Sequence, residues 1–503
     1  MKSFSKPVMR RIITIFLTLN LFSFLNAQIS HPSLEPLFPV TGGSKNYTAD
    51  QVFEMGLLFS ECQRDSDDWN RCWVQFEVIK EEVTSEEFMS LGEEERGKAI
   101  LKLLYRDYLA AYKFSQTRID VAMDKGFYNC VSSAVLYMAA AKAAGLDVRG
   151  QRTTQHAFCS IYVPDYVSDA EGNPGQLKKI DVETTNPYGF NPGSKEEIEN
   201  ESKIKKYYVV PKKYYSNRSE ISDGFFTGLI AGNLCSDYIK TSDYQKAVPL
   251  GAARWEAVRY ENPDAVAFVR NEFDILAGNY VNLKPEKAES YSSTLDWFYS
   301  FIERWGNDAF LQKNLDNSFI NLLVLCNKEQ NYPLAKSAYE KYIDKVSQSQ
   351  LTKAEEIMTD IIILTATNNL SSKEKVAETN RLLATKELAS DARQKRGKQH
   401  LELFWITRLN ELMKAGEYIE GYAEAGAALE VLPKSSKIKN MQNSFYNNLI
   451  AILHNGFARY ANAGDYETAR AILIEGLKKF PEDRTLKKDL ADIDKLINSK
   501  ANN

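Results

Sequence analysis

A repeated pattern in the C-terminal half of this 503-residue chain constrains its fold more than any other feature. Two segments 48 residues apart carry similar residues at the same relative positions, including Gly-Glu-Tyr at 416–418 and Gly-Asp-Tyr at 464–466. Self-similarity at a fixed period of roughly 20–50 residues is typical of proteins built from stacked supersecondary units. The sequence therefore predicts an array of helical hairpins over residues 222–498. The matching positions are Trp405, Leu412, Gly416, Tyr418, Ala425, Ala428, Leu429 and Pro433 in one copy, and Leu453, Tyr460, Gly464, Tyr466, Leu473, Gly476, Leu477 and Pro481 in the other.

The pattern resembles the tetratricopeptide repeat, in which small and large residues interlock two antiparallel helices. Looser copies lie around Tyr244 and around Tyr332. The step of 48 residues exceeds the usual period of about 34, which predicts longer helices or an inserted element. The resemblance implies that the array binds a peptide or protein, as repeat arrays commonly do.

The first 27 residues have the pattern of a secretory signal peptide. Four basic residues precede an apolar stretch from Ile12 to Leu25, and the small residue Ala27 follows at the expected cleavage site. The alternative, a retained membrane anchor, needs a longer apolar run to cross a hydrocarbon layer of about 30 Å. The pattern predicts an exported chain, periplasmic or secreted, with no integral membrane span after cleavage. A mostly helical segment is expected at residues 28–94.

The charge balance argues against one class of partner. The chain has 63 Lys and Arg residues against 67 Asp and Glu residues, for a net charge of −4. A surface this balanced does not attract nucleic acid through bulk charge. We therefore expect no nucleic-acid partner.

Six cysteines are too few to stabilise a chain of this length as a disulfide scaffold. Cys62 and Cys72 lie ten positions apart in a polar stretch. In an oxidising compartment they form either a local disulfide or remain two free thiols, and the sequence does not choose between these. Cys235 and Cys326 fall on packing positions of the repeat, so we expect them to be buried.

Residues 95–220 differ in character from the repeats. An amphipathic helix with a glycine after it is followed by two strand-like runs. The connector between the runs is rich in Asp, Gly and Pro, which predicts an antiparallel hairpin. The fold class is therefore α+β for this region, joined to an all-α hairpin array. The expected elements are a helix at 130–144, strands at 156–163 and 179–185, and a candidate edge strand at 207–211.

The residues that could carry chemistry lie on these elements. Cys130 opens the predicted helix, and Asn129 before it is suited to cap the helix. The positive end of the helix dipole favours the thiolate, and the first free backbone N–H groups can stabilise an oxyanion. His156 begins one strand, and Asp181 and Glu183 share a face of the next. If the strands pair, an acid can orient the imidazole ring while its other nitrogen faces the thiol.

Three motifs in this order resemble the transglutaminase-like cysteine superfamily, which shares its Cys-His-Asp arrangement with papain-type proteases. They are Gly-x-x-Asn-Cys-Val-Ser-Ser-Ala around Cys130, His-Ala-Phe from His156, and an acid-x-Thr strand. The resemblance covers residues 95–215 and implies a nucleophile at Cys130 and a general base and acid at His156. The orienting acid is Asp181 or Glu183. Glu183 fits the acid-x-Thr spacing best, whereas Asp181 has the usual residue type, so both remain candidates.

These observations support two functions. The first is an exported cysteine-dependent acyl-transfer enzyme, a peptidase or amidase if water accepts the acyl group and a transamidase if an amine does. The second is a catalytically inactive transglutaminase-like protein that serves as a repeat-based binding scaffold. A metalloenzyme using Cys130, Cys159 and His156 is disfavoured, because Cys159 is expected on the opposite strand face from His156. We therefore expect neither a metal nor a cofactor.

Overall fold

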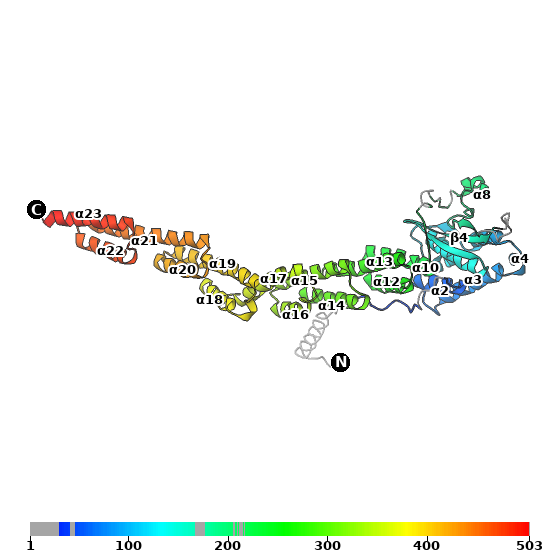
Figure 1. The fold of residues 1–503 in the computed structure, drawn as a ribbon, viewed down its shortest axis with the longest axis horizontal. Helices are drawn as coiled ribbons and strands as arrows, with labels where there is room; N and C mark the ends of the chain where they lie inside the picture. The colour runs from blue at the N-terminus through cyan, green and yellow to red at the C-terminus, as the bar shows by residue number, and fades with distance from the viewer. Residues whose placement is uncertain are drawn as a thin grey trace, which may run out of the picture. The chain divides into compact units, whose positions relative to one another are not determined.

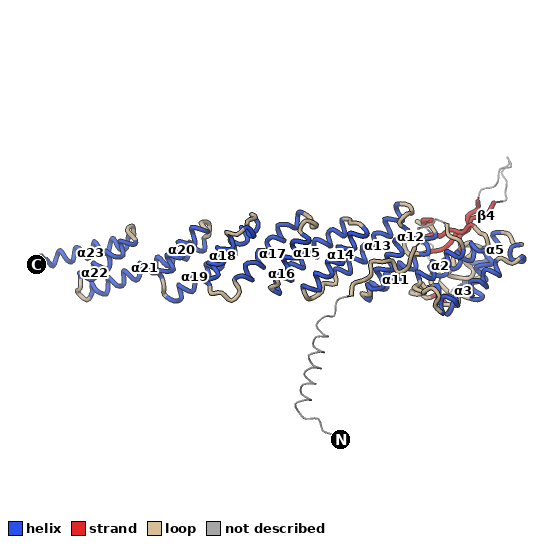
Figure 2. Tube along the Cα trace, turned by 90° about the horizontal axis from the view of Figure 1, so that it is seen from below, coloured by secondary structure: helices blue, strands red, loops and turns tan. Residues whose placement is uncertain are grey.

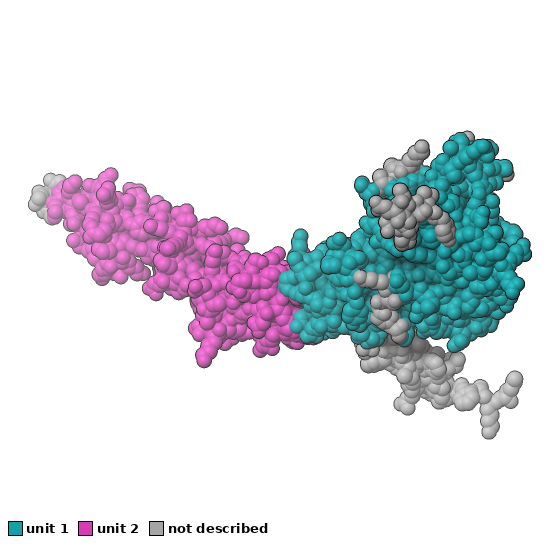
Figure 3. All heavy atoms as spheres, turned by 45° about the vertical axis from the view of Figure 1, so that its right-hand side comes forward, with its two compact units in different colours: residues 1–284, 293–314 teal, residues 285–292, 315–503 magenta. Residues whose placement is uncertain are grey.

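The computed structural model describes residues 30–40, 46–165, 177–204, 207–208, 210, 215 and 217–501. The chain divides into two compact units (Figure 3). The first comprises Met1–Lys284 and Ser293–Asn314, and the second comprises Pro285–Ser292 and Leu315–Asn503. The predicted signal peptide at 1–27 lies outside the described residues. Within the described ranges, no helix is both long enough and apolar enough to cross a membrane.

Helix α7 (Cys130–Ala143) lies at the centre of the first unit. It begins after its N-cap Asn129 and is followed by Gly145, whose φ of 72° favours glycine. Eleven of its 14 residues are buried, so the prediction of an amphipathic helix is wrong. The reason is that α2 (Ala49–Phe59), α5 (Glu93–Asp107) and strands of a sheet all pack against it. Small side chains such as its alanines allow this close approach.

A four-stranded antiparallel sheet packs against α7 in the order β5-β4-β3-β6. The predicted hairpin is confirmed as β4 (Ala157–Pro164) and β5 (Leu177–Val182). Two further strands, β3 (Asp147–Arg152) and β6 (Ser219–Ile221), have no counterpart in the sequence-based prediction. The chain is thus mostly helical with one small antiparallel sheet, as Figure 2 shows.

The edge of the sheet differs from the prediction. The described residues of the run 207–211, at positions 207, 208 and 210, belong to no strand. The edge position beside β3 is taken by β6, whose three residues pair with Gly150–Arg152. A separate pair of short parallel strands joins β1 (Ala111–Tyr112) to β2 (Phe127–Tyr128) just before α7.

Helical hairpins begin within the first unit. Helices α11 (Leu229–Thr241) and α12 (Tyr244–Val258) pack side by side, and α13 (Pro263–Val281) packs on α12. Cys235 is buried at this contact, and its thiol donates to the carbonyl of Ala247 over 3.4 Å. The packing role predicted for Cys235 is therefore confirmed. The remaining helices of this unit are α3 (Asp67–Val83), α4 (Glu86–Met89), α6 (Ile119–Lys125), α8 (Lys195–Glu199), α9 (Glu201–Ile204) and α10 (Asp223–Thr227).

The choice between a disulfide and two thiols at Cys62 and Cys72 is settled by the structure. Both cysteines are free and buried. Burial, with a smaller contribution from the neighbouring Cys62, raises the pKa of Cys72 to about 12. Cys326 is also buried, as predicted, and burial raises its pKa to about 11.

The second unit consists of helices, among them the two strongest repeat copies (Figure 1). Helix α19 (Asp391–Ala415) has 25 residues and α21 (Ser436–Asn462) has 27. Their length explains the 48-residue step, so the expectation of longer helices is confirmed. Gly416 and Gly464 lie in the turns after these helices with φ of 78° and 80°. The partner helices and remaining elements are α14 (Ala288–Trp305) and α15 (Ala309–Glu329), which contribute residues to both units, then α16 (Tyr332–Tyr342), α17 (Gln348–Ala366), α18 (Ser372–Leu383), the 3₁₀ helix η2 (Lys386–Leu388), α20 (Tyr418–Val431), α22 (Tyr466–Lys479) and α23 (Arg484–Ala501).

Candidate active site

Cys130 is held at the N-terminus of α7 by the cap that precedes it. The side-chain oxygen of Asn129 accepts the N–H groups of Val131 (2.9 Å) and Ser132 (3.1 Å). The backbone N–H of Cys130 has no hydrogen-bond acceptor among the described residues. The sequence predicts several free N–H groups at this end of the helix, and the structure leaves one. Cys130 is partly exposed, whereas the other five cysteines, all of them described, are buried.

His156 stands at the end of the tight turn between β3 and β4. The N–H of Thr153 donates to its carbonyl over 2.8 Å, which fixes the backbone of the turn. The His156 side chain is almost fully buried, and its Nε2 lies 2.6 Å from Oε2 of Glu183. Glu183 thus occupies Nε2, and Cys130 lies close enough to the ring for its side chain to raise the pKa of His156.

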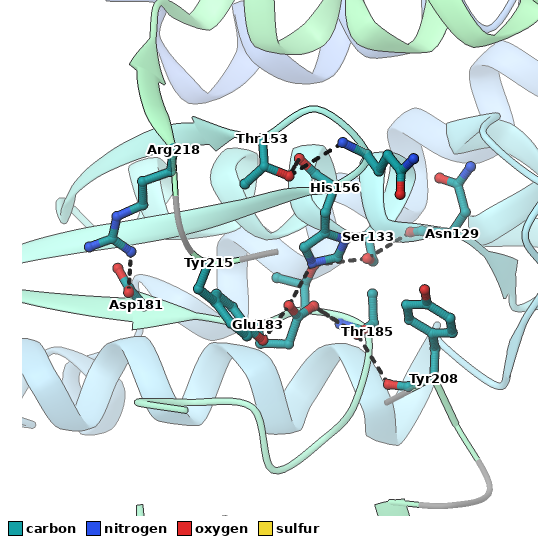
Figure 4. Close-up of polar contacts among 12 residues, drawn as sticks. Asn129, Ser133, Thr153, His156, Asp181, Glu183, Thr185, Tyr208, Tyr215 and Arg218 are labelled. Atoms are coloured by element: carbon teal, nitrogen blue, oxygen red, sulfur yellow. Dashed lines mark hydrogen bonds and ion pairs between the residues drawn. The ribbon is translucent and has the colours of Figure 1, made fainter. Parts of the chain in front are cut away.

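Glu183 is a buried carboxylate with hydrogen-bond donors on both oxygens (Figure 4). Oε2 faces His156 and also accepts from the hydroxyl of Tyr215 over 2.9 Å. Oε1 accepts the N–H of Thr185 at 3.0 Å and its hydroxyl at 2.7 Å. Four donors thus hold the carboxylate in one orientation, which offsets the cost of burying its charge.

The backbone around Glu183 is fixed by neighbouring elements. Its N–H donates to the carbonyl of Gly189 over 2.8 Å, which closes the loop after β5. The hydroxyl of Thr184 lies 2.8 Å from that of Ser133 on α7. Tyr105 of α5 donates to the carbonyl of Thr184 over 2.9 Å. The segment that carries Glu183 is therefore hydrogen-bonded to α7, the helix that begins at Cys130.

Asp181 lies apart from His156. In the register of β4 and β5 it is opposite Ser160, whose hydroxyl donates to it over 2.7 Å, and its other oxygen is paired with Arg218. Figure 4 shows this pair away from the imidazole ring. Val182 is opposite Cys159, so the next position along, Glu183, is the one that reaches the histidine end of the hairpin. Of the two candidate acids, the structure brings only Glu183 to His156.

Cys130, His156 and Glu183 follow one another in a row, and the electrostatics of this row favour a charged His156 ring. Burial lowers the pKa of His156, but the charge of Glu183 and hydrogen bonds with Cys130 and Glu183 outweigh it and raise the pKa to about 10. Burial likewise acts to raise the pKa of Glu183, yet the charge of His156 and the hydrogen bonds to it keep that pKa below its ordinary value. The ring is therefore an imidazolium at neutral pH, flanked by two groups that stabilise its charge.

This charge has a consequence for pH dependence. The ordinary histidine pKa of 6.5 applies to the unfolded chain and about 10 to the folded chain. The folded state holds a proton between these values that the unfolded state releases, so stability falls as the pH rises from 6.5 to about 10. We expect ¹⁵N-histidine NMR to show His156, assigned with a His156→Gln variant, titrating near pH 10. Titration near pH 6.5 would contradict the arrangement.

Cys159 belongs to the core, as predicted. Its thiol donates to the carbonyl of Ala134 on α7 over 3.3 Å, and it is fully buried. It thus points into the packed face of the sheet. Across the described parts of the chain, no group of three or more His, Cys, Asp or Glu side chains is placed to hold a metal ion.

A cleft of about 600 Å³ opens over this row. One wall is formed by residues around Cys130 and by the turn that carries His156. Helices α11, α12 and α13 also line the cleft, through Leu229, Asn233, Arg254 and Phe268, among others. The first helices of the predicted repeat region therefore line the cleft above the cysteine.

Two features of the site were not anticipated from the sequence. Tyr215, a donor to Glu183, is one of several tyrosines in a segment whose pattern suggested no function. Helices α11–α13, which the sequence assigns to the repeat array, line the cleft of the cysteine domain. Neither has a motif of its own, so only the packing brings them to the site. Comparison of the chain with known family models, with characterised proteins and with solved structures finds no match.

Proposed function

We propose that this chain is an exported, cysteine-dependent acyl-transfer enzyme of the peptidase, amidase or transamidase type. The observation that carries the proposal is the row formed by Cys130, His156 and Glu183 beneath an open cleft. A nucleophile, a base and an orienting acid in this order are the requirements for covalent acyl transfer. The resemblance of the three motifs to the transglutaminase-like superfamily supports the same assignment.

In the first half of the reaction the Cys130 thiolate attacks the carbonyl carbon of an amide in the cleft. The tetrahedral oxyanion accepts a hydrogen bond from the Cys130 N–H, the one donor left over at the helix end. The imidazolium of His156 gives its Nδ1 proton to the departing amine, and the C–N bond breaks. A thioester on Cys130 and a neutral imidazole remain.

In the second half, His156 takes a proton from water or from an amine that attacks the thioester. The C–S bond breaks, the thiolate is released and the imidazolium is restored. Glu183 stays ionised throughout, and it holds the ring and stabilises its charge in both halves. An amine acceptor gives transamidation and water gives hydrolysis.

The proposal is tested by the relative reactivity of the cysteines. Iodoacetamide at neutral pH, with quantification of each cysteine by mass spectrometry, should label Cys130 at least about tenfold faster than a cysteine in the denatured chain, because Cys130 is partly exposed and lies beside the imidazolium of His156. The other five cysteines should react more slowly than in the denatured chain, since they are buried. His156→Gln should bring Cys130 back to the denatured rate. Labelling of native Cys130 at or below that rate would contradict the proposal.

One observation favours an additional binding role for the second unit. Its helices expose large apolar side chains, among them Leu403 (57%), Ile419 (63%) and Ile452 (54%). These side chains are candidate contacts for a peptide or protein partner, which repeat arrays commonly bind. A Cys130→Ala variant separates the two functions, because it should lose acyl transfer and keep partner binding. If Cys130→Ala retained every function, the inactive scaffold would be the better description.

A further inference from the structure

The charged residues that line the cleft are not balanced. Lys240 is paired with Asp237 over 2.7 Å, and Arg254 is paired with Glu272. His156 also lines the cleft, and its charge is balanced by Glu183. Arg152 is the remaining charged residue of the lining. No acidic side chain among the described residues lies within ion-pair distance of it. One positive charge in the cleft is therefore left without a direct partner.

The Arg152 side chain rests on aromatic rings. Its guanidinium lies over the ring of Phe268 on α13, 3.9 Å from the centroid, and 5.6 Å from that of Phe225 on α10. Stacking of this kind holds the guanidinium plane and leaves its N–H groups free to point outward at its edges. Partial burial lowers the pKa of Arg152, and Glu272 and Arg254 act on it from a distance.

Arg152 is also fixed next to the reacting groups. It is the last residue of β3 and lies opposite Ala157, which follows His156 directly. The backbone bond between Thr153 and His156 ties the end of β3 to the histidine turn. Arg152 lines the same cleft as Cys130 and His156, so a substrate whose carbonyl reaches Cys130 lies in the cleft that the Arg152 side chain lines.

We infer that Arg152 is a specificity residue that binds a carboxylate of the substrate, so that this enzyme prefers acidic peptides. The inference rests on the proposed function and deepens it. A guanidinium forms two parallel hydrogen bonds with a carboxylate. A glutamine in place of a glutamate in the substrate has the same size but cannot accept both of these hydrogen bonds. The carboxylate belongs to a Glu or Asp side chain or to a chain terminus near the scissile amide.

The test uses pairs of covalent probes that differ only in one negative charge. Acetyl-Glu-Ala and acetyl-Gln-Ala chloromethyl ketones report a side-chain carboxylate. An epoxysuccinyl dipeptide as free acid and as ethyl ester reports a terminal one. In the wild-type full chain we expect one acid probe to alkylate Cys130 about tenfold faster than its neutral counterpart.

Three variants locate the source of this preference. Arg152→Met should bring the acid-to-neutral rate ratio close to that of a free cysteine, through loss of the faster rate of the acid probe. Arg152→Lys should keep part of the ratio, because it keeps the charge. Lys240→Met is the matched control, since it removes a cation of the same cleft that already has a partner, and it should keep the ratio. If Arg152→Met fails to fold, two other measurements test the role of Arg152. The acid-to-neutral rate ratio should be reduced in Arg152→Lys, and the wild-type ratio should be lost in molar NaCl.

The outcomes separate this inference from the function on which it rests. Fast reaction of Cys130 with the acid and neutral probes alike, or a ratio unchanged in Arg152→Met, overturns the role of Arg152 and leaves the acyl-transfer proposal standing. No reaction at Cys130 beyond that of the denatured chain, with any of the four probes, overturns both. A ratio that depends on Arg152 in only one probe pair supports the inference and identifies the source of the carboxylate.

Discussion

Glu183→Gln is expected to slow alkylation of Cys130 at neutral pH by about tenfold, toward the rate of a cysteine in the denatured chain, since it removes the charge that orients and ionises the ring. Asp181→Asn is expected to leave the rate within about twofold of wild type, because Asp181 contacts Ser160 and Arg218 and not the ring. The measurement is the rate of iodoacetamide labelling of Cys130 across a range of pH. The difference between the two rates identifies the carboxylate that orients the His156 ring.

The physical reason lies in the donors around Glu183. Glutamine keeps the size of the side chain, but its amide nitrogen would face a donor, either Tyr215 or Thr185. A buried donor left without an acceptor costs about 1–3 kcal/mol, so a modest loss of stability should accompany the change.

A positioning role also predicts a spectroscopic change. Without the charge of Glu183, the pKa of His156 should fall from about 10, and the pH profile of labelling should move with it. Thermal melts of both variants give the control for misfolding. Equal rates for Glu183→Gln and wild type, or a large loss in Asp181→Asn alone, would show that the wrong acid has been assigned.

The sequence could not decide between these two acids, and it placed both on the strand, whereas β5 ends at Val182 and Glu183 directly follows it. Helix α7 and the β4–β5 hairpin follow from local signals: a cap at Asn129, a glycine at 145 and turn-forming residues in the connector. The register of one strand against another depends on side-chain packing across the sheet, and a single sequence does not display it. That register determines that Glu183, not Asp181, meets His156.

In the rest of the fold, too, elements with local sequence signals were predictable and those set by tertiary packing were not. The long repeat helices were predictable because Gly416 and Gly464 mark their ends at a fixed spacing. Strand β6 has only three residues and pairs with β3 from about seventy positions away. Nothing in its local sequence distinguishes it from a loop. The cleft wall from α11–α13 is likewise a product of tertiary packing, which explains why Arg152 and its aromatic support were not recognised in the sequence.

Of the glycine-to-alanine substitutions near the site, Gly189→Ala should reduce stability and the labelling rate of Cys130 the most. A Cβ at this position would lie 2.0 Å from the carbonyl oxygen of Glu183 and 2.8 Å from its Cβ. Because the nearest atom belongs to the backbone, no side-chain rotation relieves the overlap. We expect a loss of about 3 kcal/mol in the stability of the loop, as for severe overpacking.

The loop can relieve this strain only by moving away from Glu183, which breaks the 2.8 Å bond from the Glu183 N–H to the Gly189 carbonyl. The carboxylate would then no longer meet the ring in its present orientation. Labelling of Cys130 should therefore slow toward the rate of Glu183→Gln, and peptides covering residues 177–190 should exchange deuterium faster.

Gly456→Ala provides the matched control for this substitution. Gly456 lies within α21, and a Cβ there would meet nothing closer than 3.8 Å. Alanine in a helix interior stabilises by about 0.8–1 kcal/mol relative to glycine, so this variant should melt no lower than wild type and label normally. If Gly189→Ala behaved like Gly456→Ala, the loop would be free to adjust. The position of Glu183 would then depend on its own four hydrogen-bond donors and not on the closure of the loop at Gly189.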